Sequence, residues 1–475
     1  MAGSLVLGID SSTQSCKAVL ADADSGEIIE SRRAAHPEGT EVDPRAWVDA
    51  LDRVVDDLLP RAEAVAVGGQ QHGMVLLDDR GEAVRPALLW NDTRSAPQAE
   101  ALTEFFGGVE QAVQRIGSLP VASFTATKIR WVQEHEPENL ARAAHIALPH
   151  DYLTKHLHAE DQLWTDRSEA SGTAYFDASR DAWLPEVLEW AAGRVLGTPR
   201  LAAPHESVGQ TSSGALLAPG AGDNAAAALG LGMRQGDVCI SLGTSAVVSS
   251  VVPHPVRDPS GMTAGFADAS GGFLPLTTSL NGAGTFDWAA RMLGVDHAGL
   301  SDLAGSAASG AGKAVFVPYL RGERTPNLPQ ARGQLLGMDA DFSRAEFARA
   351  VMEGVACAVR EGLEAMLAHT RIEPRRILLV GGGAASEAFR AILAGILGCP
   401  VQVPPPGESA AVGAARQAAW ILSGSANPPD WSESLGEMRT YEEPLADGVY
   451  QRYADYRNQL YPQTLTATSG AADGS

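Results

Sequence analysis

The sequence predicts an α/β fold built from two related domains, and three observations support this prediction. The chain of 475 residues is too long for one hydrophobic core. Two distant stretches, 5–20 and 237–251, share one form: an apolar strand, a turn of small residues and a second apolar strand. Elsewhere short apolar strands alternate with helical patterns, as in α/β sheets. We therefore divide the chain into 1–217, 218–464 and a disordered tail, 465–475.

The first repeated stretch runs from the strand at Leu5 to a second strand that begins at Ala18, through a turn rich in Ser and Thr. Such a turn exposes N–H groups and hydroxyls that can wrap a phosphate chain. The carboxylate of Asp10, at the end of the strand, could hold Mg²⁺ directly or through water. One such stretch is often a plain hairpin. Its echo around 241–244 favours two phosphate turns that face one nucleotide.

Composition limits the classes of function. With 45% hydrophobic and 20% charged residues, the chain has an ordinary soluble globular composition. The formal net charge of -22 argues against nucleic acid as a partner, and solubility is its plainest explanation. The four cysteines form no CxxC pair, which argues against a zinc site or a disulfide framework. A basic leader and an apolar run of about 20 residues are both missing, so we expect a cytoplasmic protein with no membrane partner.

Polar residues follow two of the predicted strands in the first domain. A helix over 44–59 and a strand over 64–67 precede a Gly-Gly-Gln-Gln-His-Gly run, whose Gln71 and His72 suit sugar hydroxyls. A turn with a satisfied histidine is the plainer alternative. The strand at Leu88–Leu89 leads to Asp92 and Arg94, which suggest a polyol pocket, or else a simple helix cap. The polar segment 165–172 is interpreted as a loop that lines a cleft.

A glycine- and proline-rich stretch over 216–223 suits a connection between domains. Asp223 follows it, at the start of an Ala-rich helix, where the helix dipole favours a carboxylate. It is therefore either a plain cap or a general base at the seam between the domains. Farther on, 344–370 is a long core helix, and the strand 376–380 meets a Gly-rich turn that a nucleotide can approach closely.

Two other apparent motifs each lack a residue that the full motif requires. Gly312-Lys313 hints at a P-loop, but Ala307 and Ala314 occupy its required Gly and Ser/Thr positions. The turn after residue 380 resembles a dinucleotide fingerprint, but three prolines stand where the acidic residue belongs, which leaves a dehydrogenase a weak alternative. HExxH and GxSxG motifs are absent.

Taken in order, seven motifs resemble the FGGY family of sugar kinases, and within it the kinases that act on D-xylulose: GIDSSTQSCKAV, GGQQHGM, LLWNDTRS, FTATKIRWV, GDNAAAALG, SLGTS and GGGAAS. The resemblance covers essentially the whole chain. It implies an actin-like fold of two domains, each built on a ribonuclease-H-like sheet. ATP, Mg²⁺ and the sugar would then meet in the cleft between the domains.

The resemblance also implies roles for individual residues. Asp223 matches the family's catalytic base, and Asp10 matches the carboxylate linked to Mg²⁺ and activity. The remaining matches are to the sugar site (Gln71, His72, Asp92, Arg94, Asn224), the first phosphate turn (Thr13, Lys17), the second (Gly243, Thr244) and the adenosine turn (Gly382, Gly383, Ala384). Gln71 departs from the family pattern, because many members have Met there.

The implied activity is ATP-dependent phosphorylation of D-xylulose to D-xylulose 5-phosphate, in pentose catabolism. Another FGGY kinase, acting on ribulose, gluconate or glycerol, is the sibling alternative. An actin- or Hsp70-like ATPase is a different class, and it has no use for His72 or Asp223. A sugar-binding regulator without catalysis is disfavoured because Asp10 and Asp223 are both present. Homodimers are common in the family, which leaves a homodimer as an open expectation.

Overall fold

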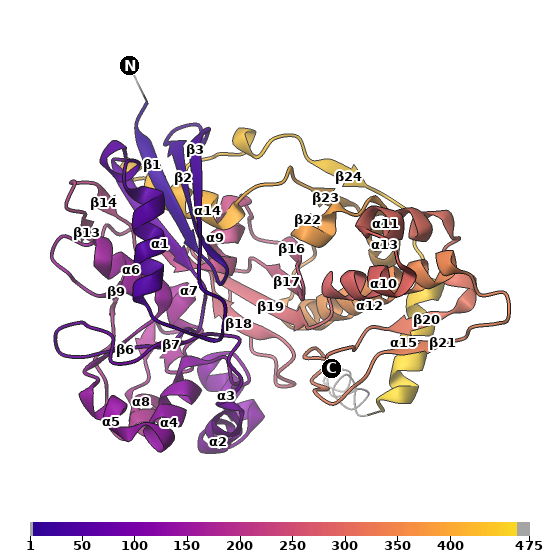
Figure 1. Cartoon of the computed structure of the whole chain (residues 1–475), viewed down its shortest axis with the longest axis horizontal. Helices are drawn as coiled ribbons and strands as arrows, with labels where there is room; N and C mark the ends of the chain where they lie inside the picture. The colour runs from indigo at the N-terminus through magenta and orange to yellow at the C-terminus, as the bar shows by residue number, and fades with distance from the viewer. Residues whose placement is uncertain (1–2, 463–475) are drawn as a thin grey trace.

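The protein is built on two seven-stranded mixed sheets, one in each of two lobes (Figure 1). The structure, a computed structural model, describes residues 3–462, so the predicted tail lies outside the described residues. The first sheet has the order β13-β14-β5-β1-β2-β3, and β15 also pairs with β5. Its strands are β1 (Leu5–Ser11), β2 (Ser15–Asp22), β3 (Ile28–Ala35), β5 (Ala64–Gly69), β13 (Gly209–Gln210), β14 (Leu216–Leu217) and β15 (Ala221–Gly222).

The second sheet repeats the central arrangement of the first. Its order is β18-β19-β17-β16-β22-β23-β24. As β1 pairs antiparallel with β2 and parallel with β5, so β16 pairs antiparallel with β17 and parallel with β22, and the two predicted hairpins occupy equivalent places. The strands are β16 (Asp237–Leu242), β17 (Ala246–Ser250), β18 (Ala264–Ala267), β19 (Phe273–Ser279), β22 (Arg376–Val380), β23 (Val401–Val403) and β24 (Arg439–Tyr441).

Helices cover both faces of the first sheet. One face packs against α1 (Arg45–Val55) and α6 (Pro149–Leu157), through side chains such as Leu7, Leu51 and Leu153. The other face packs against α14 (Ser409–Ser423), which comes from the far end of the chain, and α14 packs in turn on α9 (Asp223–Gly230). The α9–α14 contact depends on glycine, since a Cβ at Gly413 would lie 1.7 Å from the carbonyl oxygen of Ala226.

The second sheet is covered by a helical layer whose centre is the predicted core helix, α12 (Arg344–Thr370). A capping box between Ser343 and Glu346 fixes its start. Around it lie α10 (Gly284–Leu293), α11 (His297–Ser306), α13 (Glu387–Leu397), α15 (Asp447–Leu460) and the hairpin of β20 (Val315–Val317) and β21 (Gln334–Leu336).

A group of shorter elements extends the first lobe and packs against Phe266 and Leu276 of the second sheet (Figure 1). Its helices are α2 (Ala96–Phe106), α3 (Val109–Ile116), α4 (Thr125–His135), α5 (Pro137–Arg142), α7 (Arg167–Ala170) and α8 (Pro185–Ala192). Its strands, with those that pair to them, are β4 (Glu41–Val42), β6 (Val75–Leu77), β7 (Ala87–Leu88), β8 (His145–Ala147), β9 (Trp164–Thr165), β10 (Phe176–Asp177), β11 (Ala182–Trp183) and β12 (Arg200–Leu201). Across residues 3–462, no helix combines the length and the apolar character needed to cross a bilayer.

Candidate active site

The turn of the first hairpin, residues 12–14, is held from two sides. The Thr13 hydroxyl accepts a hydrogen bond from Trp90 Nε1 at 2.8 Å. On the other side the Nδ1 atom of His36 lies 2.9 Å from the carbonyl oxygen of Ser12, and the backbone N–H of His36 donates to the carbonyl of Gln14. These contacts preorganise the turn, and sequence analysis overlooked the part of His36.

Within residues 3–462, the turn of the second hairpin, residues 243–245, is held by backbone hydrogen bonds alone. The carbonyl oxygen of Gly243 accepts from the N–H of Ala283 at 2.7 Å, and that of Thr244 accepts from the N–H of Gly282 at 3.0 Å. Gly282 has to be glycine, since a Cβ there would lie 2.4 Å from the backbone of Ser245. Within the described residues the Thr244 hydroxyl has no hydrogen-bond partner, which leaves it available to a ligand.

Asp10 lies buried at the end of β1 as the centre of a small charged group. Its Oδ2 atom is 3.4 Å from Lys17 Nζ and accepts from the Ser12 hydroxyl at 3.3 Å. Lys17 also pairs at 2.7 Å with Glu408, which directly precedes α14. The Oδ1 atom of Asp10 is buried and has no hydrogen-bond partner among the described residues. Burial raises the pKa of Asp10, although Lys17 opposes that rise.

The sheet register brings Asp223 to the same place. In β5, Gly68 pairs with Asp10 of β1 on one side and with Ala221 of β15 on the other, and Asp223 begins α9 two residues later. Its Oδ1 atom accepts from the backbone N–H of Asn224 at 2.7 Å and from that residue's side chain at 3.0 Å. Burial, with the negative charge of Asp10, raises the pKa of Asp223 to about 7. A carboxylate with that pKa is suited to accept a proton near neutral pH.

His72 follows β5 in a left-handed backbone conformation, with φ of 69°. Its Nδ1 atom lies 2.6 Å from the carbonyl oxygen of Gly172, and its ring lies against Phe124 and Phe266. Burial lowers the pKa of His72 to about 3, so the ring is neutral. Since a carbonyl oxygen can only accept, Nδ1 carries the proton and Nε2 is left as an acceptor for a hydroxyl. The neighbouring Gln71 is buried and donates to the carbonyl of Ser168 at 2.9 Å.

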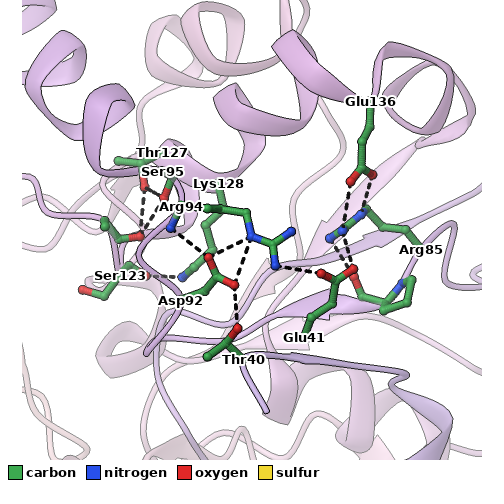
Figure 2. A network of polar contacts seen from close by, with 12 residues as sticks. Thr40, Glu41, Arg85, Asp92, Arg94, Ser95, Ser123, Thr127, Lys128 and Glu136 are labelled. Atoms are coloured by element: carbon green, nitrogen blue, oxygen red, sulfur yellow. Dashed lines mark hydrogen bonds and ion pairs between the residues drawn. The ribbon is translucent and has the colours of Figure 1, made fainter.

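Lys128, in α4, supports the backbone of His72, and the sequence analysis overlooked it. Its buried ammonium donates to the carbonyl oxygen of His72 at 3.0 Å. It also donates to the carbonyl oxygen of Ser123 (Figure 2). Thr125 donates to the same His72 carbonyl at 3.1 Å. Burial lowers the pKa of Lys128 to about 7. The signal in the sequence was a lysine within the largely apolar FTATKIRWV motif, since charged side chains are rarely buried among apolar residues unless they are paired.

Asp92 and Arg94 lie together in a network of ion pairs (Figure 2). Arg94 Nε donates to both Asp92 oxygens, at 2.9 and 3.1 Å, and its terminal nitrogen pairs with Glu41 at 2.8 Å. Asp92 also accepts from the Thr40 hydroxyl at 2.8 Å, and Glu41 pairs onward with Arg85. The network links β4 to the segment that follows β7, so it fixes the position of that segment beside Lys128.

The Gly-rich turn after β22 forms a short 3-10 helix, Gly382–Ala385. Gly381, with φ of 91°, begins it. A Cβ at Gly383 would lie 2.5 Å from the Leu242 side chain, whereas one at Gly382 would meet nothing within 4 Å. The turn therefore packs closely on the end of β16, with the open backbone of Gly382 facing outward.

The prediction of a cleft-wall loop over 165–172 is wrong. The segment contains the short helix α7 and is buried, with Asp166 as its cap. The Ser168 hydroxyl accepts from the backbone N–H of Gly222 at 2.9 Å, while its carbonyl holds Gln71. This buried helix thus supports the segments that carry Gln71 and Asp223. The polar composition misled because Asp166 and Ser168 bond within the segment and to distant backbone, while both carboxylate oxygens of Glu169 are buried with no partner among the described residues.

Two halves of a single family match the chain. The N-terminal domain of the FGGY family of carbohydrate kinases matches residues 5–230, and its C-terminal domain matches residues 238–422. The chain belongs to the FGGY family of carbohydrate kinases. It is therefore a phosphotransferase that acts on an alcohol group of a carbohydrate, and kinases of this family take the phosphate from ATP.

Curated relatives and solved structures agree with the family. The xylulose kinase of Streptomyces coelicolor is 42% identical over 94% of this chain and 93% of its own, and that of Streptomyces rubiginosus is 42% identical over 89% of each. The crystal structure of xylulose kinase from Bifidobacterium adolescentis superposes with a TM-score of 0.88, at 41% identity over 96% of this chain and 100% of that one. A Plasmodium falciparum glycerol kinase, 19% identical over 98% of each chain with a TM-score of 0.85, shares the fold. The predicted actin-like, two-domain architecture is confirmed.

Proposed function

We propose that this kinase phosphorylates D-xylulose at its C5 hydroxyl, giving D-xylulose 5-phosphate, as a step in pentose catabolism. The observation that carries the proposal is Asp223, which begins α9 directly after β15 and has its pKa raised to about 7 by burial and by the charge of Asp10, on β1 across β5 from β15. The identity to xylulose kinases over most of the chain supports the choice of sugar.

In this proposal Asp223 is the general base. It takes the proton from the C5 hydroxyl as that oxygen attacks the γ-phosphate of ATP, a contribution typically worth about 10²–10⁴ in rate. Asn224 fixes the carboxylate by its two hydrogen bonds to one oxygen, which leaves the other oxygen for the sugar. The pKa near 7 lets a large fraction of the enzyme carry the free carboxylate at neutral pH.

Asp10 fits the role of holding Mg²⁺. The fit rests on its buried Oδ1 atom, which has no partner among the described residues, and on the hardness of carboxylate oxygen. In the part of the chain that the structure describes, no group of three or more His, Cys, Asp or Glu side chains could hold a metal ion, so most ligands would be water and phosphate oxygens. When bound, the ion supplies charge neutralisation at the phosphates.

The sugar contacts would come mainly from residues 1–217, with Asn224 added from the start of α9. The Nε2 atom of neutral His72 accepts from a sugar hydroxyl, and Gln71 and Asn224 line the same site. Asp92 and Arg94 bond one another and the residues behind them, which supports a role in shaping the pocket. Their direct contact with the sugar stays a prediction.

The nucleotide would bridge the lobes. Thr13 and Lys17 in the first hairpin, and Gly243 and Thr244 in the second, would bind the phosphates. The turn at residues 382–384, which includes Gly382, Gly383 and Ala384, would bind the adenosine. The sugar side is then residues 1–217 and the nucleotide side 218–464, and closure of the lobes would exclude water from the transfer.

The test is ADP release by the purified protein with Mg·ATP. The panel is D-xylulose, D-ribulose, L-ribulose, gluconate and glycerol, with a blank that lacks sugar. We expect strong stimulation by D-xylulose alone. Stimulation by another member would move the specificity within the family, and turnover equal to the blank throughout would remove the proposed substrate. Light scattering during gel filtration checks the expected homodimer.

A further inference from the structure

A cavity of about 800 Å³ lies at the end of the second sheet opposite to the phosphate turn. It is lined by the starts of β16 and β22, by β23 and β24, and by residues 430–435. Residues 430–435 belong to the segment that runs from α14 to β24, which Figure 1 shows along the upper edge of the molecule. β16 separates it from the turn at residues 243–245 by about 17 Å, at 3.3 Å per residue. Its size suits a small-molecule ligand, and its place excludes the site proposed for ATP.

Four arginines line this cavity, in a chain where acidic residues outnumber basic ones by 58 to 36. Arg416 is buried, and its guanidinium donates to the backbone carbonyls of Pro429 and Leu229, each at 2.8 Å. Among the described residues it forms no ion pair. A buried cation normally has an anionic partner, since water no longer stabilises its charge.

The other three guanidiniums differ in how well nearby carboxylates neutralise their charge. Arg376 pairs with the buried Asp237 at 2.7 Å. Arg234 is exposed, and it reaches Asp430 only at 3.5 Å. Within the described residues, the Arg375 side chain forms no hydrogen bond or ion pair. One further carboxylate, Glu442, lines the cavity from an exposed position.

Three guanidiniums thus face one cavity, Arg234, Arg375 and Arg416, and two lining carboxylates, Asp430 and Glu442, remain to neutralise them. Guanidinium forks bind phosphate by paired, charge-assisted hydrogen bonds. Gln402 and Thr440, which also line the cavity, add neutral polar groups. We propose that this cavity is a second binding site, separate from the catalytic cleft, for a small anion that carries phosphate groups.

The proposed site would lie where α9, α14 and the second sheet meet. α9 begins at Asp223 and ends at Gly230, and Gly230 lines the cavity. Arg416 belongs to α14, which packs along α9 and across the first sheet. An anion bound here would therefore contact both the helix that carries the proposed base and the second sheet.

The experiment is calorimetric titration of the full chain with pyrophosphate, in buffer without divalent metal and with ADP saturating the nucleotide site. We expect saturable binding by the wild type. The double variant Arg234→Gln/Arg375→Gln should bind at least about ten-fold more weakly, because two charge-assisted contacts are lost. Both side chains are exposed, so the variant should keep its Tm. The single variant Arg375→Gln should fall between the two.

The control is Arg53→Gln, which removes an exposed arginine from α1, outside the cavity lining. It should bind pyrophosphate within two-fold of the wild type. Three results would overturn the proposal: no saturable binding in any titration, binding that is seen only in a parallel titration without ADP, or binding that the double variant leaves within two-fold of the wild type. The last two would place the anion elsewhere, in the cleft or on another surface.

Discussion

The β1–β2 and β16–β17 hairpins share their pairing but differ in chemistry. Asp10 and Ser241 each follow an isoleucine near the end of the first strand of a hairpin. Asp10 anchors a charged group with Lys17, whereas the second turn is held by backbone hydrogen bonds and carries the Thr244 and Ser245 hydroxyls, which have no hydrogen-bond partner among the described residues. The two hairpins therefore share one geometry but differ in chemistry: the first carries charged side chains, and the second relies on backbone groups.

The segments next to the hairpins continue this division. After β5, which neighbours β1, come Gln71 and His72, with side chains suited to hydroxyls. After β22, which neighbours β16, comes the turn at residues 382–385, composed only of Gly and Ala. Under the proposed function, the first lobe would therefore bind the sugar through side chains, and the second would bind the nucleotide through backbone groups.

The strongest test of this difference between the two lobes is to remove Asp223, the proposed base. Asp223→Ala should lower kcat by about 10³, within the range typical for a general base. The assay is coupled ADP release, with Tm as the check on folding. Asp56→Ala, which removes an exposed carboxylate from the end of α1, is the control and should keep full activity. A near-normal rate in Asp223→Ala would remove Asp223 from that role.

The next test compares equivalent strand positions, Asp10→Asn against Ser241→Ala. We expect kcat/KM of the wild type to fall below about pH 7, as Asp223 becomes protonated. Asp10→Asn should lower kcat about 10²-fold, and it should also move this limb to lower pH, because a negative charge that raises the Asp223 pKa is gone. Ser241→Ala should leave the limb in place. Equal midpoints in the two variants would contradict the coupling.

Local patterns predicted much of this fold. Both hairpins, the strand 64–67 and the helix 344–370 follow from apolar periodicity, glycines and caps, which act over a few residues. The helix expected over 44–59 is α1 followed by the 3-10 helix Leu59–Arg61, since the periodicity extends beyond the α-helical part.

Contacts between distant segments could not be predicted in this way. The packing of α14 on the first sheet, the Lys17–Glu408 ion pair and the support of His72 by Lys128 join residues that lie from 56 to more than 400 positions apart. No short window of sequence contains such a pair. The buried helix α7 was mistaken for a loop for the same reason, because what satisfies its polar groups includes Gln71 and Gly222.

His72→Ala tests whether the segment after β5 serves the sugar. It should raise the KM for the sugar by about 10- to 100-fold, because the sugar hydroxyl that donates to His72 would lose its partner in a buried site. The KM for ATP should rise by less than three-fold. The matched variant is Gln71→Met, which should change the sugar KM less, because Gln71 already bonds Ser168. Unchanged sugar affinity in His72→Ala would indicate a purely structural histidine.

The smallest effect separates the two turns themselves. Thr244→Val removes a hydroxyl with no partner among the described residues, so the KM for ATP should rise by about 2- to 10-fold while the KM for the sugar stays constant. Thr13→Val removes a hydroxyl that also bonds Trp90, in the segment that leads to Asp92. It should therefore raise both KM values. Steady-state kinetics with each substrate varied in turn measures this, and identical patterns would mean that the turns are not divided in function.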